Sequence, residues 1–513
     1  MTDEPVMVVG DSNRDGRIDI DDLYNHHQWS WAYGAFTLAN LDDDDGDGKA
    51  DCNDLVVNGE ADERDIAQLR IFAPLISGME GSNLTIDWND APIHVFRKTD
   101  SGWTLVNKGK SFQIGPEAEV TLGLEALCFA GMQGWNGHIQ LRVTRVSPQG
   151  SPLGEDSVAV RVAPWLMLPN SARTRIFYIA TGKYDNAFML KELEQILPGL
   201  GTKFPVPYKT AKWQEMWMQD TMEMGYSEIP GGGRMHVVLN GIRGADSFGP
   251  TLLGKDVGVI TVGYNRNMSG HDAWADWYGN LEVSHPTPEH PFGRIYYGCN
   301  TDSGATLHPE VVHFLKLQEL QSPIWVDTSW LAIKHVDEIF NFIPGPDGKG
   351  MMTVGSPAEA ARVTGTTLDA FNLDIQAKVE KMLSGGEYKI GGSLVKYDGV
   401  YRLLGFSSER TLFLPVLFNP VEVDSSSARP GAHNRWSNPV NSVFVNGSLV
   451  TGGAYVPEAV RADLRKKLQG AGVRDVYFVD DRVYQDRWGN VHCSSNTCRE
   501  PLFDEFWKYI PNR

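Results

Sequence analysis

The chain has few cysteines, no long apolar run and no excess of basic residues, and each of these absences excludes a class of protein. Five cysteines in 513 residues, scattered and odd in number, argue against a disulfide scaffold, and their spacing does not indicate zinc. No apolar run approaches the ~18 residues of a membrane-spanning helix. Lys and Arg number 46 against 65 Asp and Glu, and the resulting net charge of −19 argues against nucleic acid or an anionic membrane as the main partner.

What is present is a folded chain with two patterns of secondary structure. Hydrophobic residues make up 42% of it, which is enough for buried cores. Over residues 71–162, short alternating runs separated by Gly, Asn, Ser and Pro predict a β-sandwich. After residue 175, strand-like and helical stretches alternate, which predicts an α/β part arranged as a barrel or with pseudo-symmetry. The segment 162–173, with two prolines, is interpreted as the linker between the two parts.

Two acidic segments have the spacing of calcium-binding loops. In residues 11–22 and 43–54, oxygen-bearing side chains fall at positions 1, 3, 5, 9 and 12, and Gly16 and Gly48 hold position 6, where such a loop turns sharply. The residue at position 7 contributes its backbone carbonyl in loops of this type. The predicted ligands are Asp11, Asn13, Asp15, Arg17, Asp19 and Asp22 in the first loop, and Asp43, Asp45, Asp47, Lys49, Asp51 and Asp54 in the second.

Calcium is favoured over two alternatives for these loops. A run of charge is often only a solvated surface, but here the spaced pattern occurs twice. Magnesium usually keeps several waters, so it has less use for a full set of protein ligands. The loops are not a regular EF-hand pair, because position 12 is Asp instead of Glu and the flanking residues do not predict clear helices.

The segment 217–226, with the sequence WMQDTMEMGY, is the first candidate for chemistry. If its backbone is extended, Asp220 points to one face while Gln219 and Glu223 point to the other. One carboxylate would then face a substrate, and the oxygen atoms behind it would bind a metal ion.

Two further segments carry residues of the kind used in nucleophilic catalysis. His335 and Asp337, in 334–338, share a face if the segment is a strand. Cys493 lies in the polar, turn-rich segment 489–497, whereas a structural cysteine is more often found within an apolar run. The alternative is a hydrogen-bonded core pair for His335 and Asp337, and a small buried hydrophobic residue for Cys493.

Together these segments resemble the peptidylarginine deiminases. The blocks WMQD-x-ME-x-GY, YGNLEVSHP followed by FGRIYYG, HVDE and VHC-x-x-N occur in that family, and the resemblance covers nearly the whole chain. It implies a mixed α+β multidomain protein, with a calcium-binding immunoglobulin-like β domain at 1–168. A pseudo-fivefold α/β propeller of the guanidine-modifying superfamily is expected at 169–513. By this resemblance, residue 1 is expected to correspond to the start of the second immunoglobulin-like domain of the animal enzymes, without a counterpart of their first.

The resemblance also implies a reaction, the calcium-dependent hydrolysis of peptidyl-arginine to peptidyl-citrulline and ammonia. Asp220 and Asp337 would bind the planar, cationic guanidinium. The Cys493 thiolate would attack its central carbon to give a covalent thiouronium. His335 would act as the general acid and base.

Binding residues follow from the same resemblance. Trp217 would pack against the aliphatic stem of the substrate arginine, and Arg243 would hold the backbone of the substrate. A second calcium site of the family is expected to be lost, because Thr221 and Asn240 stand where it has acidic ligands. The calcium ligands expected beneath the active centre are the side chains of Gln219, Glu223 and Glu282 and the backbone carbonyls of Tyr278 and Leu281.

Several alternatives remain open at this point. A free-arginine or agmatine deiminase or an amidinotransferase would use the same chemistry on a small substrate. A calcium-dependent binding protein with an inactive catalytic domain and a cysteine protease are rivals from other classes. The expected partners are arginine-containing proteins and peptides. Low-affinity calcium loops favour a secreted protein although residues 1–5 begin no recognisable signal peptide, and a cytoplasmic location is the alternative.

Overall fold

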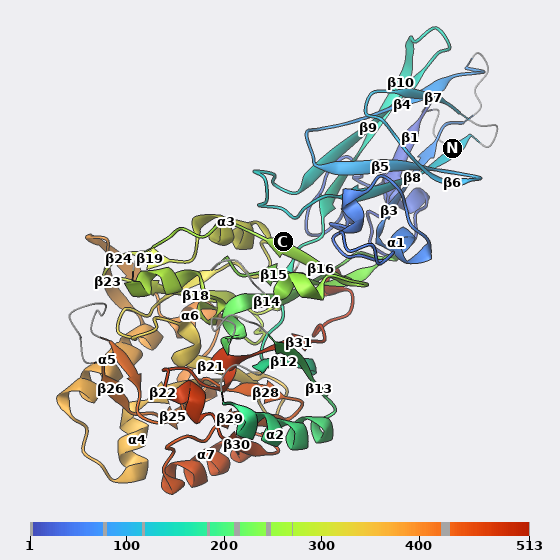
Figure 1. Cartoon of the computed structure of the whole chain (residues 1–513). Helices are drawn as coiled ribbons and strands as arrows, with labels where there is room; N and C mark the ends of the chain where they lie inside the picture. Colours follow the sequence, from blue (N-terminus) through green and yellow to red (C-terminus); the bar gives the residue numbers. More distant parts are fainter. Residues whose placement is uncertain are drawn as a thin grey trace.

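The computed structural model shows a β-rich part at one end of a larger mixed α/β part (Figure 1). No helix within the described ranges is both long enough and apolar enough to span a bilayer. The structure describes residues 4–74, 79–114, 118–181, 185–209, 216–242, 248–268, 270–421 and 431–511.

The N-terminal part is built from two five-stranded sheets, and this confirms the predicted β-sandwich. Their inward side chains, such as Leu69 and Leu122 from one sheet and Leu141 from the other, belong to a single buried core. The first sheet has the order β1 (Met7–Gly10), β3 (Ala67–Phe72), β8 (Glu119–Ala126), β5 (Ile93–Thr99) and β6 (Gly102–Leu105). The second has the order β2 (Ala35–Thr37), β10 (Pro152–Val162), β9 (His138–Val146), β4 (Asn83–Trp88) and β7 (Ser111–Gln113).

The larger part repeats one strand pattern in five small sheets of the described chain. In each repeat, called a unit below, the first strand is antiparallel to the second and the second is parallel to the third. The units are β14 (Met222–Glu228), β15 (Arg234–Asn240) and β16 (Val257–Thr261); β17 (Leu281–Val283), β18 (Ile295–Asn300) and β20 (Ile324–Asp327); β21 (Phe340–Pro344), β22 (Gly350–Ser356) and β25 (Thr411–Pro415); β28 (Val443–Val445), β29 (Ser448–Gly452) and β30 (Val476–Val479); and β31 (Ser495–Arg499), β12 (Thr174–Thr181) and β13 (Lys203–Lys209).

Helices supply the crossover that joins the second strand to the third in four of the five units. Parallel neighbours need such a long connection, which explains the alternation of strand and helix in the sequence. These helices are α2 (Ala187–Ile196), α3 (Pro309–Leu317), α4 (Pro357–Thr364) with α5 (Ala370–Ser384), and α7 (Glu458–Gly470).

Shorter elements fill the connections between and around the units. These elements are α1 (Glu60–Asp65), β11 (Leu166–Met167), β19 (Ala305–Thr306), β23 (Gly386–Ile390), β24 (Ser393–Tyr397), α6 (Val400–Leu404), β26 (Phe418–Pro420), β27 (Ala432–Asn434), α8 (Arg482–Gln485) and α9 (Val491–Ser494). Two of them, β23 and β24, form a hairpin whose Tyr388 and Tyr397 pack against Trp325 of β20, and two others, β26 and β27, pair with each other.

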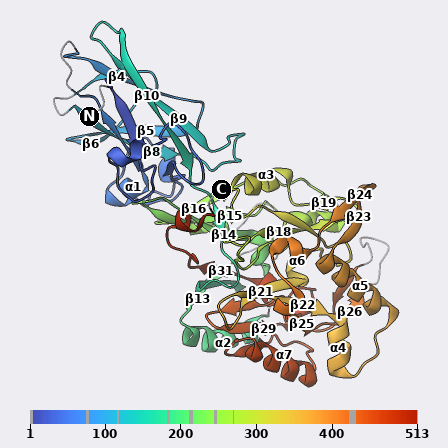
Figure 2. The same cartoon turned by 180° about the vertical axis from the view of Figure 1, so that it is seen from behind.

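The fifth unit joins the two ends of this part of the chain. Its first strand, β31, is the last strand in the sequence, and it pairs with β12, the strand that opens the repeats. In Figure 2, β31 and β13 are close together, and in the sheet they lie on the two sides of β12. The last strand therefore completes a unit that the first strands leave unfinished.

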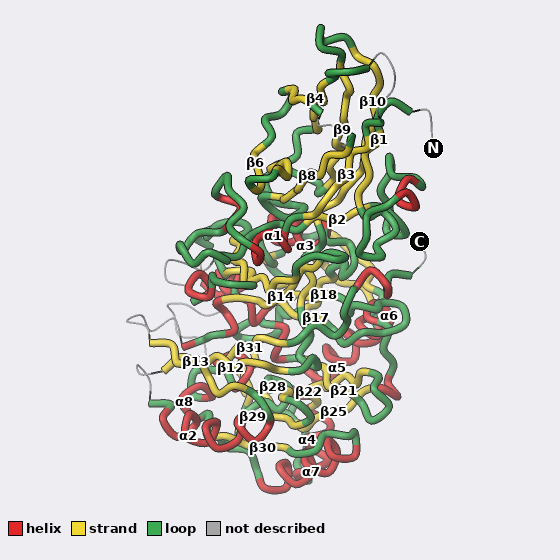
Figure 3. The backbone as a smooth tube through the Cα atoms, turned by 90° about the vertical axis from the view of Figure 1, so that its right-hand side faces the viewer, coloured by secondary structure: helices red, strands yellow, loops and turns green. Residues whose placement is uncertain are grey.

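The segment predicted as a linker is packed instead of exposed. Its residues from 162 to 172 are all buried, and β11 within it pairs with β14. The indole N–H of Trp165 donates to the Val237 carbonyl at 3.0 Å, and Arg161 on β10 pairs with Glu319 at 2.9 Å. In the side view of Figure 3 the sandwich strands rise from this junction. The boundary between residues 168 and 169 stays a prediction.

Candidate active site

The candidate catalytic residues lie at equivalent places in the fold, where the chain enters the first strand of a unit. Asp220 precedes β14, His335 and Asp337 precede β21, and Cys493 in α9 precedes β31. All four are buried. The shared pattern of the units thus brings together residues that lie far apart in the sequence.

The extended backbone expected around these residues is wrong. Gln219–Thr221 and Val336–Glu338 are short 3-10 helices, and β14 begins only at Met222. The expected division of the side chains nevertheless holds, because Asp220 lines one cavity whereas Gln219 and Glu223 line another.

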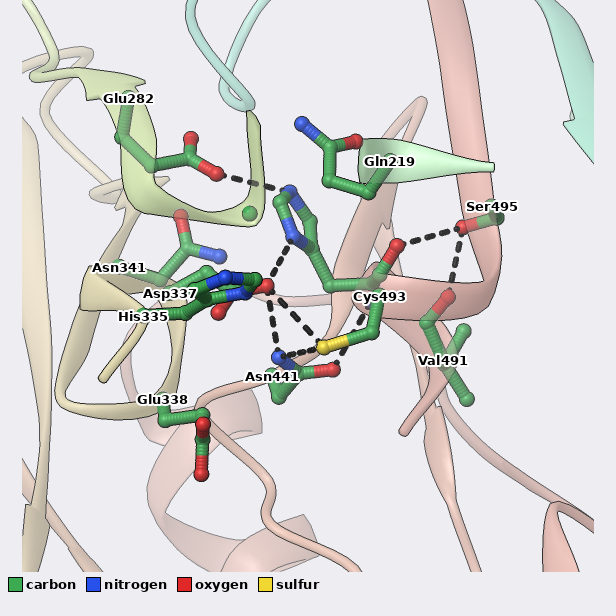
Figure 4. A network of polar contacts seen from close by, with 12 residues as sticks. Gln219, Glu282, His335, Asp337, Glu338, Asn341, Asn441, Val491, Cys493 and Ser495 are labelled. Carbon is green, nitrogen blue, oxygen red and sulfur yellow. Dashed lines mark hydrogen bonds and ion pairs between the residues drawn. The ribbon is translucent and has the colours of Figure 1, made fainter. Parts of the chain in front are cut away.

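The carboxylate of Asp337 is the hub of the site, as Figure 4 shows. Its Oδ2 atom accepts hydrogen bonds from Asn441 Nδ2 at 2.8 Å and from His492 Nδ1 at 3.0 Å. The thiol of Cys493 also donates to it at 3.3 Å. Its other oxygen, Oδ1, is buried without a hydrogen-bond partner among the described residues, so it remains available to a donor from a substrate.

The Cys493 thiol lies in a setting that disfavours its anion. Burial raises its pKa well above the usual value, and the charges of Asp337, Glu338 and Asp220 raise it further. A cation entering this site would offset the repulsion and favour the thiolate.

Asp220 and His335 form the second half of the site. Asp220 Oδ1 accepts the backbone N–H of Gly279 at 3.1 Å and lies 3.6 Å from Nδ1 of His335. The other ring nitrogen of His335 is 3.0 Å from the carbonyl oxygen of Trp274, which fixes the ring. A Cβ atom at Gly279 would lie 2.6 Å from His335 Nδ1, so this close approach requires glycine.

Asp220, His335 and Cys493 open onto one cavity of about 280 Å³, and Asp337 lies behind Cys493 without lining it. The predicted residue Trp217 lines it, whereas Arg243 lies outside the described residues. Sequence reasoning missed the other indoles of the wall, because isolated tryptophans form no motif. The lining consists of Met216, Trp217, Asp220, Trp274, Trp277, Ile333, His335, Arg487, Trp488, Gly489 and Cys493.

A second, polar site lies behind the first. Gln219, Glu223 and Glu282 line a small cavity of about 30 Å³, roughly the space of one water molecule or ion. Gln219 Nε2 donates to Glu223, and Glu282 lies 3.3 Å from Nε2 of His492. Burial raises the pKa of Glu282 to about 7, and burial together with the charge of Glu282 raises that of Glu223 well above its usual value.

This donor set fits calcium. The charge of Glu282 raises the pKa of Glu223, whereas the charges of His492 and Arg499, which line the same cavity, lower that of Glu282. Carboxylate and amide oxygens are calcium ligands. The Tyr278 carbonyl accepts the Leu281 N–H in the turn that leads into β17, the strand that carries Glu282. At the second family site, which the sequence predicts to be lost, the side chains bond other protein groups: Thr221 donates to the Met218 carbonyl and Asn240 donates to Thr261.

Both predicted loops have the backbone of calcium-binding loops. Gly16 and Gly48 have φ values of 84° and 86°, in the left-handed region that favours glycine. The Gly16 N–H donates to Asp11 and the Gly48 N–H donates to Asp43, both at 2.9 Å. In the second loop the carboxylates of Asp43, Asp45 and Asp51 lie within 4.8 Å of one another.

A neighbouring acidic group was missed from the sequence. Asp42, Asp44 and Asp65 also lie within 4.8 Å of one another, and the backbone N–H of Asp256, from the larger part, donates to Asp42 at 3.0 Å. Burial and mutual repulsion raise the pKa of Asp42 to about 7 and that of Asp65 to about 8. Residues 42–45 are four consecutive aspartates, and alternate side chains of such a run point to opposite sides if the backbone is extended. The sequence therefore already indicated a second acidic group beside the predicted loop.

Comparisons with known proteins agree with the motifs. The model of the family described as Protein-arginine deiminase (PAD) matches residues 152–380 and 397–508. Human protein-arginine deiminase type-4 is 24% identical over 581 residues, covering 100% of this chain and 84% of that protein. Human type-3 is 26% identical over 573 residues, covering 98% and 82%.

Among solved structures, the agmatine deiminases of C. jejuni and Enterococcus faecalis are similar to the chain. The first is 14% identical and covers 66% of this chain and 97% of that one, with a TM-score of 0.41. The second is 11% identical and covers 66% and 96%, with a TM-score of 0.38.

The family match defines the class, which is that of hydrolases acting on amidines. Within it, the chain belongs to the protein-arginine deiminase family. The resemblance found in the motifs is thereby confirmed.

Proposed function

We propose that the protein hydrolyses arginine residues of polypeptides to citrulline and ammonia, with calcium as its cofactor. The observation that carries this proposal is the arrangement of Asp220, His335 and Cys493 around one cavity, with Asp337 bonded to the thiol. Two separate carboxylates beside a cysteine suit a planar cation that presents several N–H donors. A protein that only bound calcium or a partner protein would need neither these carboxylates nor the cysteine.

The residues divide the reaction between them. Asp220 and Asp337 hold the guanidinium, whose positive charge favours the Cys493 thiolate. Sulfur bonds to the central carbon, the C–N bond breaks, and His335 protonates the departing ammonia. Water activated by His335 then adds to the carbon as the C–S bond breaks, which releases citrulline and restores the thiol.

Calcium would be held by Gln219, Glu223 and Glu282, with the carbonyls of Tyr278 and Leu281. Bound there, the ion supplies positive charge that offsets the repulsion between the two glutamates. Gln219 and Glu223 stand on either side of Asp220 in the sequence, so they hold the turn that aims Asp220 into the cavity. The two loops of the sandwich would bind further calcium and stabilise that part of the fold.

The finer description of the fold is part of the proposal. The five repeated units support the pseudo-fivefold propeller at 169–513, and the two packed sheets support the immunoglobulin-like domain at 1–168. The secreted location, with a cytoplasmic one as the alternative, likewise rests on the calcium loops.

The test compares a peptide containing arginine with free arginine and agmatine, each with calcium and with a chelator. Ammonia release and citrulline formation are measured for wild type, Cys493→Ser and Cys498→Ser. Cys498 is also buried, on β31, but does not line the cavity, so it is the matched control. We expect turnover of the peptide with calcium, none for Cys493→Ser, and near-wild-type turnover for Cys498→Ser. Preferred use of free arginine or agmatine would favour the alternative deiminases.

A further inference from the structure

Four of the five units place a functional group where the chain enters their first strand. The groups are Asp220 before β14, the Gly279 N–H before β17, the pair His335 and Asp337 before β21, and Cys493 before β31. In the remaining unit, the equivalent segment before β28 carries Asn441. No motif points to this residue, and it is fully buried.

The side chain of Asn441 contacts both partners of the reaction proposed above (Figure 4). Its Nδ2 atom donates to Asp337 Oδ2 at 2.8 Å and to Cys493 Sγ at 3.0 Å. Because an amide nitrogen has two hydrogens, it can bond the carboxylate and the sulfur together. The Oδ1 atom of Asn441 accepts a hydrogen bond from the backbone N–H of Cys493 at 3.1 Å. The backbone carbonyl of Asn441 accepts one from the backbone N–H of His492 at 3.3 Å.

We propose that Asn441 is a positioning residue that holds the nucleophile beside Asp337. When the thiol ionises, sulfur and carboxylate become two anions in contact, and the Asn441 NH₂ group donates a hydrogen bond to each. The reacting sulfur then stays next to the carboxylate that holds the guanidinium. This role rests on the proposed function, but the contact with the sulfur can be tested without a substrate.

A purely structural asparagine provides the matched comparison. Asn438 lies three residues earlier in the same segment and is equally buried. Its amide bonds only backbone groups, donating to the Glu338 carbonyl at 2.8 Å and accepting from the Val440 N–H at 3.1 Å. Loss of either asparagine removes buried hydrogen bonds, but only Asn441 touches the sulfur.

The experiment uses the full chain with saturating calcium and compares Asn441→Ala with Asn438→Ala. Three quantities are measured: the melting temperature, the rate at which iodoacetamide alkylates Cys493, and kcat on an arginine peptide. Mass spectrometry of the peptide that contains Cys493 gives the alkylation rate. In Asn441→Ala the alkylation rate and kcat should each fall by about 10- to 100-fold, which is the size of effect expected from the loss of one hydrogen bond to a charged group. Asn441→Leu, which has a similar volume but adds neither a charge nor a hydrogen-bond donor, serves if the alanine variant does not fold.

The direction of the alkylation change separates the two explanations. A merely destabilised site exposes Cys493, so its alkylation becomes faster, as expected for Asn438→Ala if it has any effect. Slower alkylation in the Asn441 variants supports the positioning role. Unchanged or faster alkylation in a folded Asn441 variant would overturn it. Failure of the proposed function looks different, since the wild type would then not turn over the peptide while the alkylation comparison still holds.

Discussion

At the scale of single residues, the site places a thiol among buried carboxylates. Asp337 accepts the thiol hydrogen, and its charge and that of Asp220 oppose the ionisation of Cys493. The same two carboxylates are the groups that bind a guanidinium in the proposed reaction. A cation bound between them would therefore favour the thiolate that these charges disfavour.

This opposition predicts that Asp337→Asn separates thiol reactivity from turnover. Removing the charge lowers the pKa of Cys493, so alkylation by iodoacetamide at neutral pH should become faster. Turnover of an arginine peptide should fall at least ~100-fold in kcat/KM, because a charged hydrogen bond and the placement of the carbon are both lost. Asp220→Asn should show the same loss of turnover. A change in kcat/KM below threefold for either variant would remove that residue from the site.

At the scale of elements, part of this site was readable in the sequence and part was not. Alternating apolar residues such as Leu84 and Ile86 predicted the sandwich, because one face of each strand must be apolar. The 3-10 turns that carry Asp220 and Asp337 were not readable, since they depend on where a strand meets the edge of its unit. The role of Asn441 could not be predicted from the sequence, because the function of an isolated asparagine in a loop depends on which residues the fold places next to it.

The two kinds of predicted calcium site belong to different elements, so mutating them should have different effects on activity and on stability. Glu223 belongs to β14, next to the turn of Asp220, whereas Asp15 lies in a loop of the sandwich. Glu223→Ala should raise the calcium concentration needed for activity by much more than Asp15→Ala does. Asp15→Ala should lower the melting temperature more, because its ion stabilises the fold. Both are checked by calcium titrations of activity and by thermal melts.

Wild-type controls decide whether this division is right. Full activity after exhaustive chelation, with calcium shown to be absent by elemental analysis, would contradict a role for the ion. Equal shifts of calcium requirement in both variants would show that the sites are not independent.

At the scale of the whole molecule, an acidic group lies where the two parts of the chain meet. Burial and repulsion raise the pKa values of Asp42 to about 7 and of Asp65 to about 8. The folded chain therefore holds protons that the unfolded chain releases near the ordinary Asp pKa of about 3.9. Their contribution to stability is complete below that pH and is lost as the pH rises through about 7 and 8.

The melting temperature of the calcium-free protein should accordingly fall as the pH is raised from about 5 to 8, where the unfolded chain has released these protons and the folded chain still holds them. Asp42→Asn, which cannot ionise, should make this slope shallower. Calcium competes with protons for carboxylates, so its stabilising effect should grow with pH. Thermal melts across this range, with and without calcium, test both points. A flat or rising melting temperature without calcium would contradict the assignment.

The pairing of β31 with β12 also fixes the order in which the machinery can be completed during synthesis. A growing chain can present Asp220, His335 and Asp337 long before Cys493 has left the ribosome. Until β31 is made, β12 lacks one of its two neighbouring strands and the nucleophile is absent from the site. Under the proposed function, the place of this one strand in the sequence would keep the chain from modifying arginine residues of the ribosome or of nascent chains before its own synthesis is complete.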